Sequence, residues 1–141
     1  MTGKKQNPFL LRNFKGVNPE YIDRLEALGI KQAGRMLSIG QTPQMRTLVA
    51  TVVEIPEAAV LELVRLSDLA RLPGVKGIRA RLYYEAGVDS VDKLAAFEPQ
   101  ELLSLTAQYV ERTGFDGAPP LPKEVSSTIE NARRLPKLVE W

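Results

Sequence analysis

The feature that most constrains the fold is a pair of glycines, thirteen residues apart, that occurs twice in the chain. Gly74 and Gly87 bracket one segment, and Gly16 and Gly29 bracket another. Glycine adopts the left-handed backbone of tight turns and helix ends without the steric cost that a Cβ imposes. We therefore predict that each pair encloses a short helix between two turns. Backbone N–H groups at the start of such a helix lack an intrahelical acceptor, so they can bind an anion.

The apolar spacing is helical almost throughout, and the alternation typical of strands is nearly absent. Prolines at first-turn positions, N-cap hydroxyls and terminal glycines divide the pattern into segments. We expect helices near 9–14, 19–29, 33–37, 42–54, 56–71, 76–87, 91–97, 99–110 and 122–135, and frayed residues at 1–7. The segment from Thr113 to Leu121 contains two glycines and two prolines, which predicts a loop.

The chain also resembles itself at a shift of about 58 residues, because Gly16 falls on Gly74 and Gly29 on Gly87. Their apolar flanks correspond as well: Leu11, Phe14, Val17 and Ile30 fall on Leu69, Leu72, Val75 and Val88. Chance similarity between helical segments is the alternative interpretation. One repeat unit cannot bury its own apolar faces fully. We therefore expect two units, 1–54 and 55–141, to pack into one compact bundle.

The stretch from Leu72 to Val88 resembles the helix-hairpin-helix superfamily in its sequence LPGVKGIRARLYYEAGV. The continuation from Gly87 to Ala95, the preceding Ser67 to Leu72 and the helix start at Ile55-Pro56 are similar to the bacterial family called domain of unknown function 4332. The resemblance covers most of the chain and is strongest over 55–105. It implies an all-α fold of two tandem helix-hairpin-helix (SAM-like) units. Such families are often suspected of binding DNA, and no established activity comes with the resemblance.

We call the turn at Gly16 the first hairpin and the turn at Gly74 the second hairpin. Each departs from the phosphate-binding pattern of that superfamily at one position. Phosphate-binding members have glycine where this chain has Lys76, and the glycine follows one residue later, at Gly77. The first hairpin has Asn18 at the matching position. Asparagine tolerates left-handed geometry better than lysine does. The alternative to phosphate binding is that both hairpins are structural copies that hold no phosphate.

Basic residues gather around the second hairpin. Four positive charges lie between positions 71 and 81 with no acidic residue among them. Together with the backbone N–H groups of Lys76 and Gly77, they suit a grip on phosphates that is independent of base sequence. The alternative is a solvated basic face without a ligand. In the first hairpin Glu20 and Asp23 would repel phosphate, so we interpret it as scaffold. The predicted nucleic-acid-binding residues are Arg71, Gly74, Val75, Lys76, Gly77, Arg79 and Arg81.

The composition excludes several kinds of chemistry. The 141 residues include no cysteine and no histidine, which removes disulfides, the usual zinc ligands and the commonest general base. No nucleotide-binding loop or nucleophile motif occurs, so we expect no catalytic residue, metal, cofactor or small-molecule substrate. The net charge is only +2, so any electrostatic footprint must be local. Without a signal-peptide pattern or a run of roughly 20 apolar residues, we expect a cytoplasmic protein with no membrane contact.

Two hypotheses for function follow. The leading one is a non-catalytic module that grips the backbone of DNA, or of RNA, through the second hairpin. The alternative is a protein–protein interaction adaptor on the same scaffold, favoured by the near-neutral charge, the altered hairpins and the acidic first hairpin. At least one of Tyr83 and Tyr84 is expected to face the core, and Trp141 is expected to be a packing anchor.

Overall fold

The computed structural model describes residues 9–141, and the expectation made for residues 1–7 lies outside that range. The described residues form α-helices and one short 3-10 helix, without a strand, so the all-α prediction is confirmed. In chain order the elements are η1 (Leu11–Asn13), α1 (Pro19–Ala27), α2 (Ala33–Ile39), α3 (Pro43–Val53), α4 (Glu57–Leu69), α5 (Gly77–Glu85), α6 (Val91–Ala95), α7 (Pro99–Thr113) and α8 (Pro122–Arg134).

Local sequence signals explain where these helices begin. The side chains of Asn18, Thr42 and Ser90 accept hydrogen bonds from backbone N–H groups in the first turns of α1, α3 and α6. α1, α3, α7 and α8 also carry proline in the first turn, where its missing N–H costs nothing. Residues 114–121 contain no helix, as predicted, whereas Thr113, predicted to begin that loop, is the last residue of α7.

The four turn glycines adopt the predicted backbone conformation. Gly16 and Gly29 have φ values of 81° and 83°, and Gly74 and Gly87 have values of 82° and 95°. Each of these conformations would be strained for a residue with a Cβ. The glycines therefore fix the turns that place α1 and α5.

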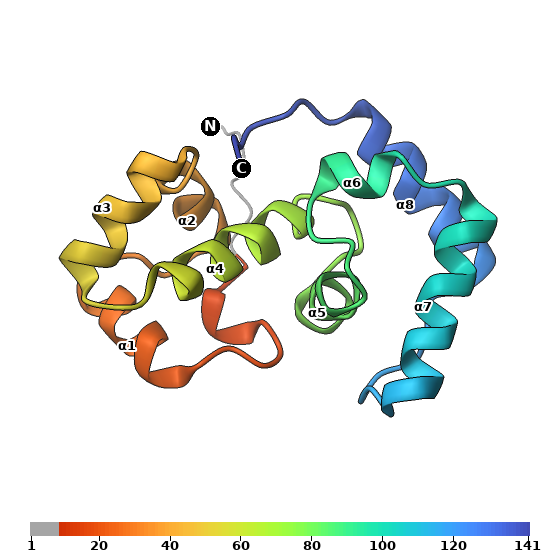
Figure 1. The fold of residues 1–141 in the computed structure, drawn as a ribbon, viewed down its shortest axis with the longest axis horizontal. Coiled ribbons are helices and arrows are strands. Elements are labelled where there is room, and N and C mark those ends of the chain that lie inside the picture. Colours follow the sequence, from red (N-terminus) through yellow and green to blue (C-terminus); the bar gives the residue numbers. More distant parts are fainter. Residues whose placement is uncertain (1–8) are drawn as a thin grey trace, which may run out of the picture.

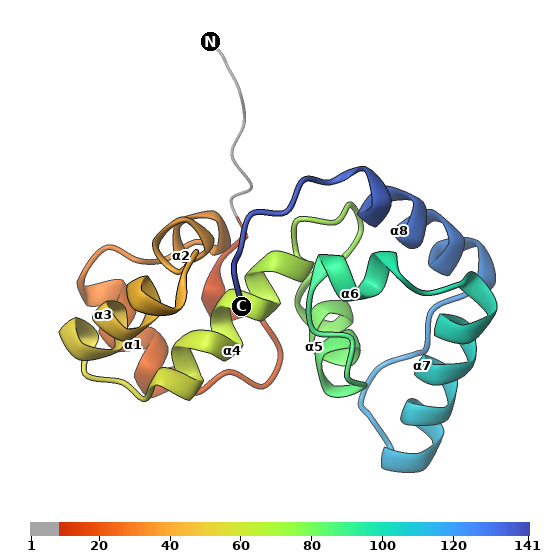
Figure 2. The ribbon, with the colours of Figure 1, turned by 45° about the horizontal axis from the view of Figure 1, so that its top comes forward.

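α4 runs through the middle of the molecule, from among α1, α2 and α3 towards α5 (Figures 1 and 2). It packs against α2, α3 and α5, while α8 packs against α6 and α7. The buried apolar side chains of both halves form one continuous cluster, from Leu11 and Phe14 to Ile129 and Val139. The core therefore extends along the whole described chain.

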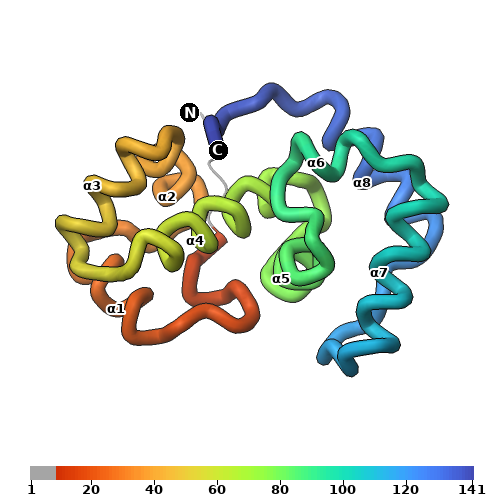
Figure 3. The backbone as a smooth tube through the Cα atoms, viewed as in Figure 1, coloured from red at the N-terminus to blue at the C-terminus, as the bar shows by residue number. Residues whose placement is uncertain are grey.

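The segment after α8 returns to the first half of the chain and ends beside α4 (Figure 3). The Glu140 N–H donates to the Gln41 carbonyl at 2.8 Å. Arg46, only 6% exposed, donates to the carbonyls of Glu140 and Trp141 at 3.0 and 3.2 Å. The guanidinium of Arg65 lies 4.4 Å from the ring centre of Trp141. Trp141 is thus a packing anchor, as expected.

Candidate binding surfaces

The second hairpin presents free backbone donors at the start of α5. Lys76 is the N-cap residue, and no side chain caps the helix. Within the described part of the chain, the N–H groups of Lys76, Gly77 and Ile78 donate to no protein acceptor. They border a hollow of about 500 Å³ that also includes Gly74, the 117–118 loop and Glu124. This hollow is the place where the hairpin would hold an anion.

The position of the glycine in this hairpin has a packing reason. A Cβ on Gly77 would lie within 3.0 Å of the Asn13 carbonyl carbon and still closer to its oxygen, so only glycine fits there. The Gly77 carbonyl also accepts a hydrogen bond from the Lys15 N–H at 3.3 Å. Lys76 has a φ of −115°, which any L-residue adopts. Gly77 therefore joins the two hairpins, and Lys76 needs no left-handed geometry.

Arg79 is bound by the protein's own acceptors. Its Nε donates to Glu124 Oε2 at 2.7 Å, and its Nη1 donates to the Ala118 carbonyl at 2.7 Å. These contacts tie the start of α5 to the loop before α8 and to α8 itself. They also place a carboxylate at the edge of the hollow, which opposes the binding of a second anion there.

Arg71 and Arg81 do not line the hollow and are held by other parts of the protein. Arg71 donates to the buried Asp68 carboxylate at 2.8 Å and to the Pro136 carbonyl at 2.6 Å. Arg81 is 6% exposed in its side chain and pairs with Glu62 at 2.7 Å. The cations predicted to act together thus serve three separate interfaces.

The other residues predicted to bind nucleic acid are partly buried in the core and partly exposed at the turn. Val75 is buried in the core, whereas Gly74 and Lys76 are exposed at the turn. Tyr83 is fully buried, which raises the pKa of its phenol to about 12, mainly by desolvation. One tyrosine of the pair therefore faces the core, as expected. Around the hollow the structure brings together Gly74, Lys76, Gly77 and Arg79, and of their side chains only that of Lys76 carries an uncompensated charge.

A second surface is apolar and lies along the outer side of α3. It is a groove of about 510 Å³, and its most exposed side chains are Leu28, Leu48 and Val52, at 54%, 63% and 60%. Large exposed apolar clusters on a small protein mark interaction sites. We call it the α3 groove; its lining residues are Leu28, Ile30, Arg35, Ser38, Ile39, Met45, Leu48, Val49, Val52 and Val53.

The sequence pattern of α3 contains a signal for this groove. Val49 and Ala50 are buried, whereas Leu48 and Val52 are exposed. At 100° per residue, these apolar side chains together cover roughly 200° of the circumference of the helix. A helix that packs on one neighbour needs an apolar stripe of only about 100°. α3 therefore carries more apolar surface than the chain itself covers.

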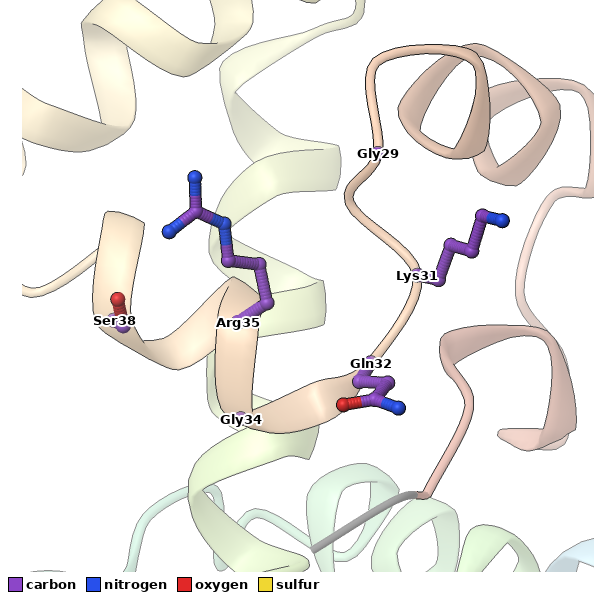
Figure 4. Close-up of a pocket in the computed structure, with 6 residues that line it drawn as sticks. All are labelled: Gly29, Lys31, Gln32, Gly34, Arg35 and Ser38. Carbon is purple, nitrogen blue, oxygen red and sulfur yellow. The ribbon is translucent and has the colours of Figure 1, made fainter. Parts of the chain in front are cut away.

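A polar hollow adjoins the α3 groove and shares Arg35 and Ser38 with it. Figure 4 shows Arg35 and Lys31 on either side of the segment that connects Gly29 to Gln32. Both side chains are exposed, and neither forms an ion pair within the described part of the chain. The apolar groove thus has an uncompensated cation at its rim.

Other kinds of site are not found among residues 9–141. No three acidic, histidine or cysteine side chains gather there in a way that could hold a metal ion. No helix within that range is long and apolar enough to cross a membrane.

The fold and these surfaces define an all-helical protein with an unpartnered apolar groove at one end and a heavily ion-paired hairpin farther along. The chain belongs to the family described as domain of unknown function DUF4332, which matches residues 15–135. The family resemblance drawn from the sequence is therefore confirmed. No curated protein and no solved structure matches the chain significantly.

Proposed function

We propose that this chain is a non-catalytic interaction module that binds another protein through the α3 groove. The observation that carries the proposal is the exposure of Leu48 and Val52, at 63% and 60%, on a helix that is also apolar on its inner side. Burying a whole leucine or valine side chain contributes about 1.5–3 kcal/mol, so covering these exposed parts would contribute about 1–2 kcal/mol each. A partner therefore gains substantial binding energy from this surface.

A comparison of the two halves supports this proposal. We interpret the chain as two tandem helix-hairpin-helix units, each beginning with a glycine-bracketed helix, α1 or α5. The helices that follow also correspond, because α2 and α3 pack on α4 much as α6 and α7 pack on α8. In that correspondence Val52 matches Tyr109. Tyr109 is covered by Phe115, with ring centres 6.2 Å apart, and donates to Glu85 at 2.8 Å. The covering residue comes from the loop before α8, and the short connection between α3 and α4 has no such loop.

Affinity capture with matched variants tests the proposal. The double variant Leu48→Asp, Val52→Asp should lose a stoichiometric partner that wild type retains, because two anchors are replaced by charges. Leu121→Asp is the control, since Leu121 is 70% exposed but lies outside the groove. Thermal melts followed by circular dichroism check that all variants are folded. Recovery of the same partners by wild type and the double variant contradicts the proposal.

Nucleic-acid backbone remains a second candidate ligand, favoured by the free N–H groups beside the exposed Lys76. Because the nearby arginines are paired, only one or two phosphates would be neutralised, so log affinity should fall with log salt with a slope of about −1 to −2. The assay is fluorescence anisotropy with labelled duplex and single-stranded DNA at low salt. Lys76→Glu should abolish binding, whereas Arg134→Glu, an exposed charge on α8, should leave it intact. No binding by wild type at micromolar protein rejects this candidate.

A further inference from the structure

We propose that the occupant of the α3 groove is an amphipathic α-helix of another protein, with an acidic residue beside its apolar stripe that pairs with Arg35. This inference rests on the proposed function and specifies the chemistry of the partner. It follows from the shape of the apolar stripe, from the charge at its rim and from the absence of acidic residues along α3.

The spacing of the groove residues fits a helical partner. Met45, Leu48, Val49 and Val52 stand at positions i, i+3, i+4 and i+7 of α3, and all four line the groove. Leu28 and Ile30 form its opposite wall, after the end of α1. A helix laid in such a groove presents its own residues at the same spacing. The stripe from Met45 to Val52 is about 10 Å long, so two turns of the partner would cover it.

The charge at the rim indicates an acidic residue in the partner. Arg35 borders both the apolar groove and the polar hollow that contains Lys31. The carboxylate of Glu26 interacts electrostatically with Lys31, but it already forms an ion pair with Arg12 at 2.9 Å. Arg35 and Lys31 thus lack the acidic partners that Arg71, Arg79 and Arg81 have. A carboxylate on the docked helix would be steered to this end of the groove and held there.

The composition of α3 distinguishes this partner from a second copy of the chain. Between Pro43 and Val53, α3 has no acidic residue. Packing α3 of one copy against α3 of another would cover the apolar stripe but would bring no carboxylate from that helix to Arg35. Charge complementarity therefore favours a different, acidic helix over self-association.

A display library of helical peptides tests the inference on the full chain. Apolar positions i, i+3, i+4 and i+7 are fixed as leucine, and the flanking positions are randomised. Peptides are selected on wild type and counter-selected on the Leu48→Asp, Val52→Asp variant. We expect enrichment of Asp or Glu at one end of the stripe. Selected peptides should bind Arg35→Glu about 5- to 10-fold more weakly at low salt, chiefly through slower association, and Arg134→Glu as tightly as wild type.

Each other outcome has a definite meaning. Enriched peptides without acidic preference, or with equal affinity for Arg35→Glu, would overturn the inference and leave the proposed function standing. Failure to find any peptide that distinguishes wild type from the double variant would reject both the inference and the groove as a protein-binding surface. If sedimentation velocity shows that wild type dimerises and the double variant does not, the occupant is a second copy and the inference is wrong.

Discussion

Replacing Val139 with aspartate should release the C-terminal segment from the first half of the protein and destabilise the fold. Val139 is 2% exposed, so its side chain contributes about 2 kcal/mol of burial. The same segment supplies two carbonyls, of Glu140 and Trp141, to the guanidinium of Arg46. Hydrogen bonds to a charged group contribute about 1.5–3 kcal/mol each, part of which water replaces when the segment leaves. We therefore expect a loss of about 3–5 kcal/mol.

Thermal and urea unfolding, followed by circular dichroism, measure this loss. For a chain of 141 residues the unfolding entropy is about 0.3 kcal/mol per kelvin, so the Tm should fall by about 10–17 °C. Val139→Ala, which only shortens the side chain, should lower it by about 5–8 °C. Glu140→Ala is the control, because its side chain is exposed and its backbone contacts are kept; it should stay within about 0.5 kcal/mol of wild type.

A double-mutant cycle with Arg46 tests the stated cause. Burial, followed by the charge of Arg65, lowers the pKa of Arg46, yet the guanidinium stays charged and needs its acceptors. If Val139→Asp acts partly by removing those acceptors, its cost should be smaller in an Arg46→Met background. A Tm within about 3 °C of wild type for Val139→Asp, or equal costs in both backgrounds, would refute the reasoning.

Three further predictions concern the hairpins and their supports. Gly77→Ala should cost about 2–4 kcal/mol in urea unfolding because its Cβ would collide with the Asn13 backbone, whereas Gly34→Ala, where a Cβ meets open space, should be neutral or stabilising. Asp68→Ala should cost about 3 kcal/mol by the same assay, since the buried carboxylate accepts from the Val91 N–H at 2.8 Å and pairs with Arg71. The pKa of Glu26 is lowered, chiefly by its hydrogen bond from Arg12. Its folded pKa lies below the unfolded value, so the stability from this pair is fully present above about pH 4.5, declines below that and is lost as the pH falls through the lowered folded pKa. Arg12→Ala should therefore lower the urea midpoint less at pH 3 than at pH 7, and an equal effect at both values would contradict that cause.

Much of the fold could be predicted because its signals are local. The positive φ of Gly74 depends on the glycine itself, and the start of α3 depends on Thr42 and Pro43. The family was predictable for the same reason, since Leu72 to Val88 carries its pattern in contiguous residues. Helix ends were predicted less accurately: α7 was expected to end near residue 110, but it continues to Thr113 because its left-handed cap is Gly114.

The sites were harder to predict because the partners of a charge lie far away in the sequence. Glu124 is 45 residues from Arg79, and the carbonyl that Arg71 binds is 65 residues away. The run of basic residues from 71 to 81 therefore could not reveal which of its members were already neutralised. The α3 groove had the opposite difficulty: Leu48 and Val52 were recognised as apolar, but which apolar residues lack a covering element depends on tertiary packing.

The two candidate surfaces belong to different parts of the molecule, and this separation allows a decisive experiment. The α3 groove is lined by α2, α3 and the residues just after α1, whereas the hollow at the second hairpin is lined by residues at the start of α5 and in the loop before α8. Figure 1 shows α3 and α5 in different parts of the molecule. Leu48→Asp should therefore abolish capture of a helical partner without changing any affinity for DNA, and Lys76→Glu should do the reverse. Neither variant alters a buried side chain, so both should keep the wild-type Tm within about 2 °C. Loss of both activities in either variant at unchanged Tm would mean that one ligand spans both surfaces, which the separation of these elements argues against.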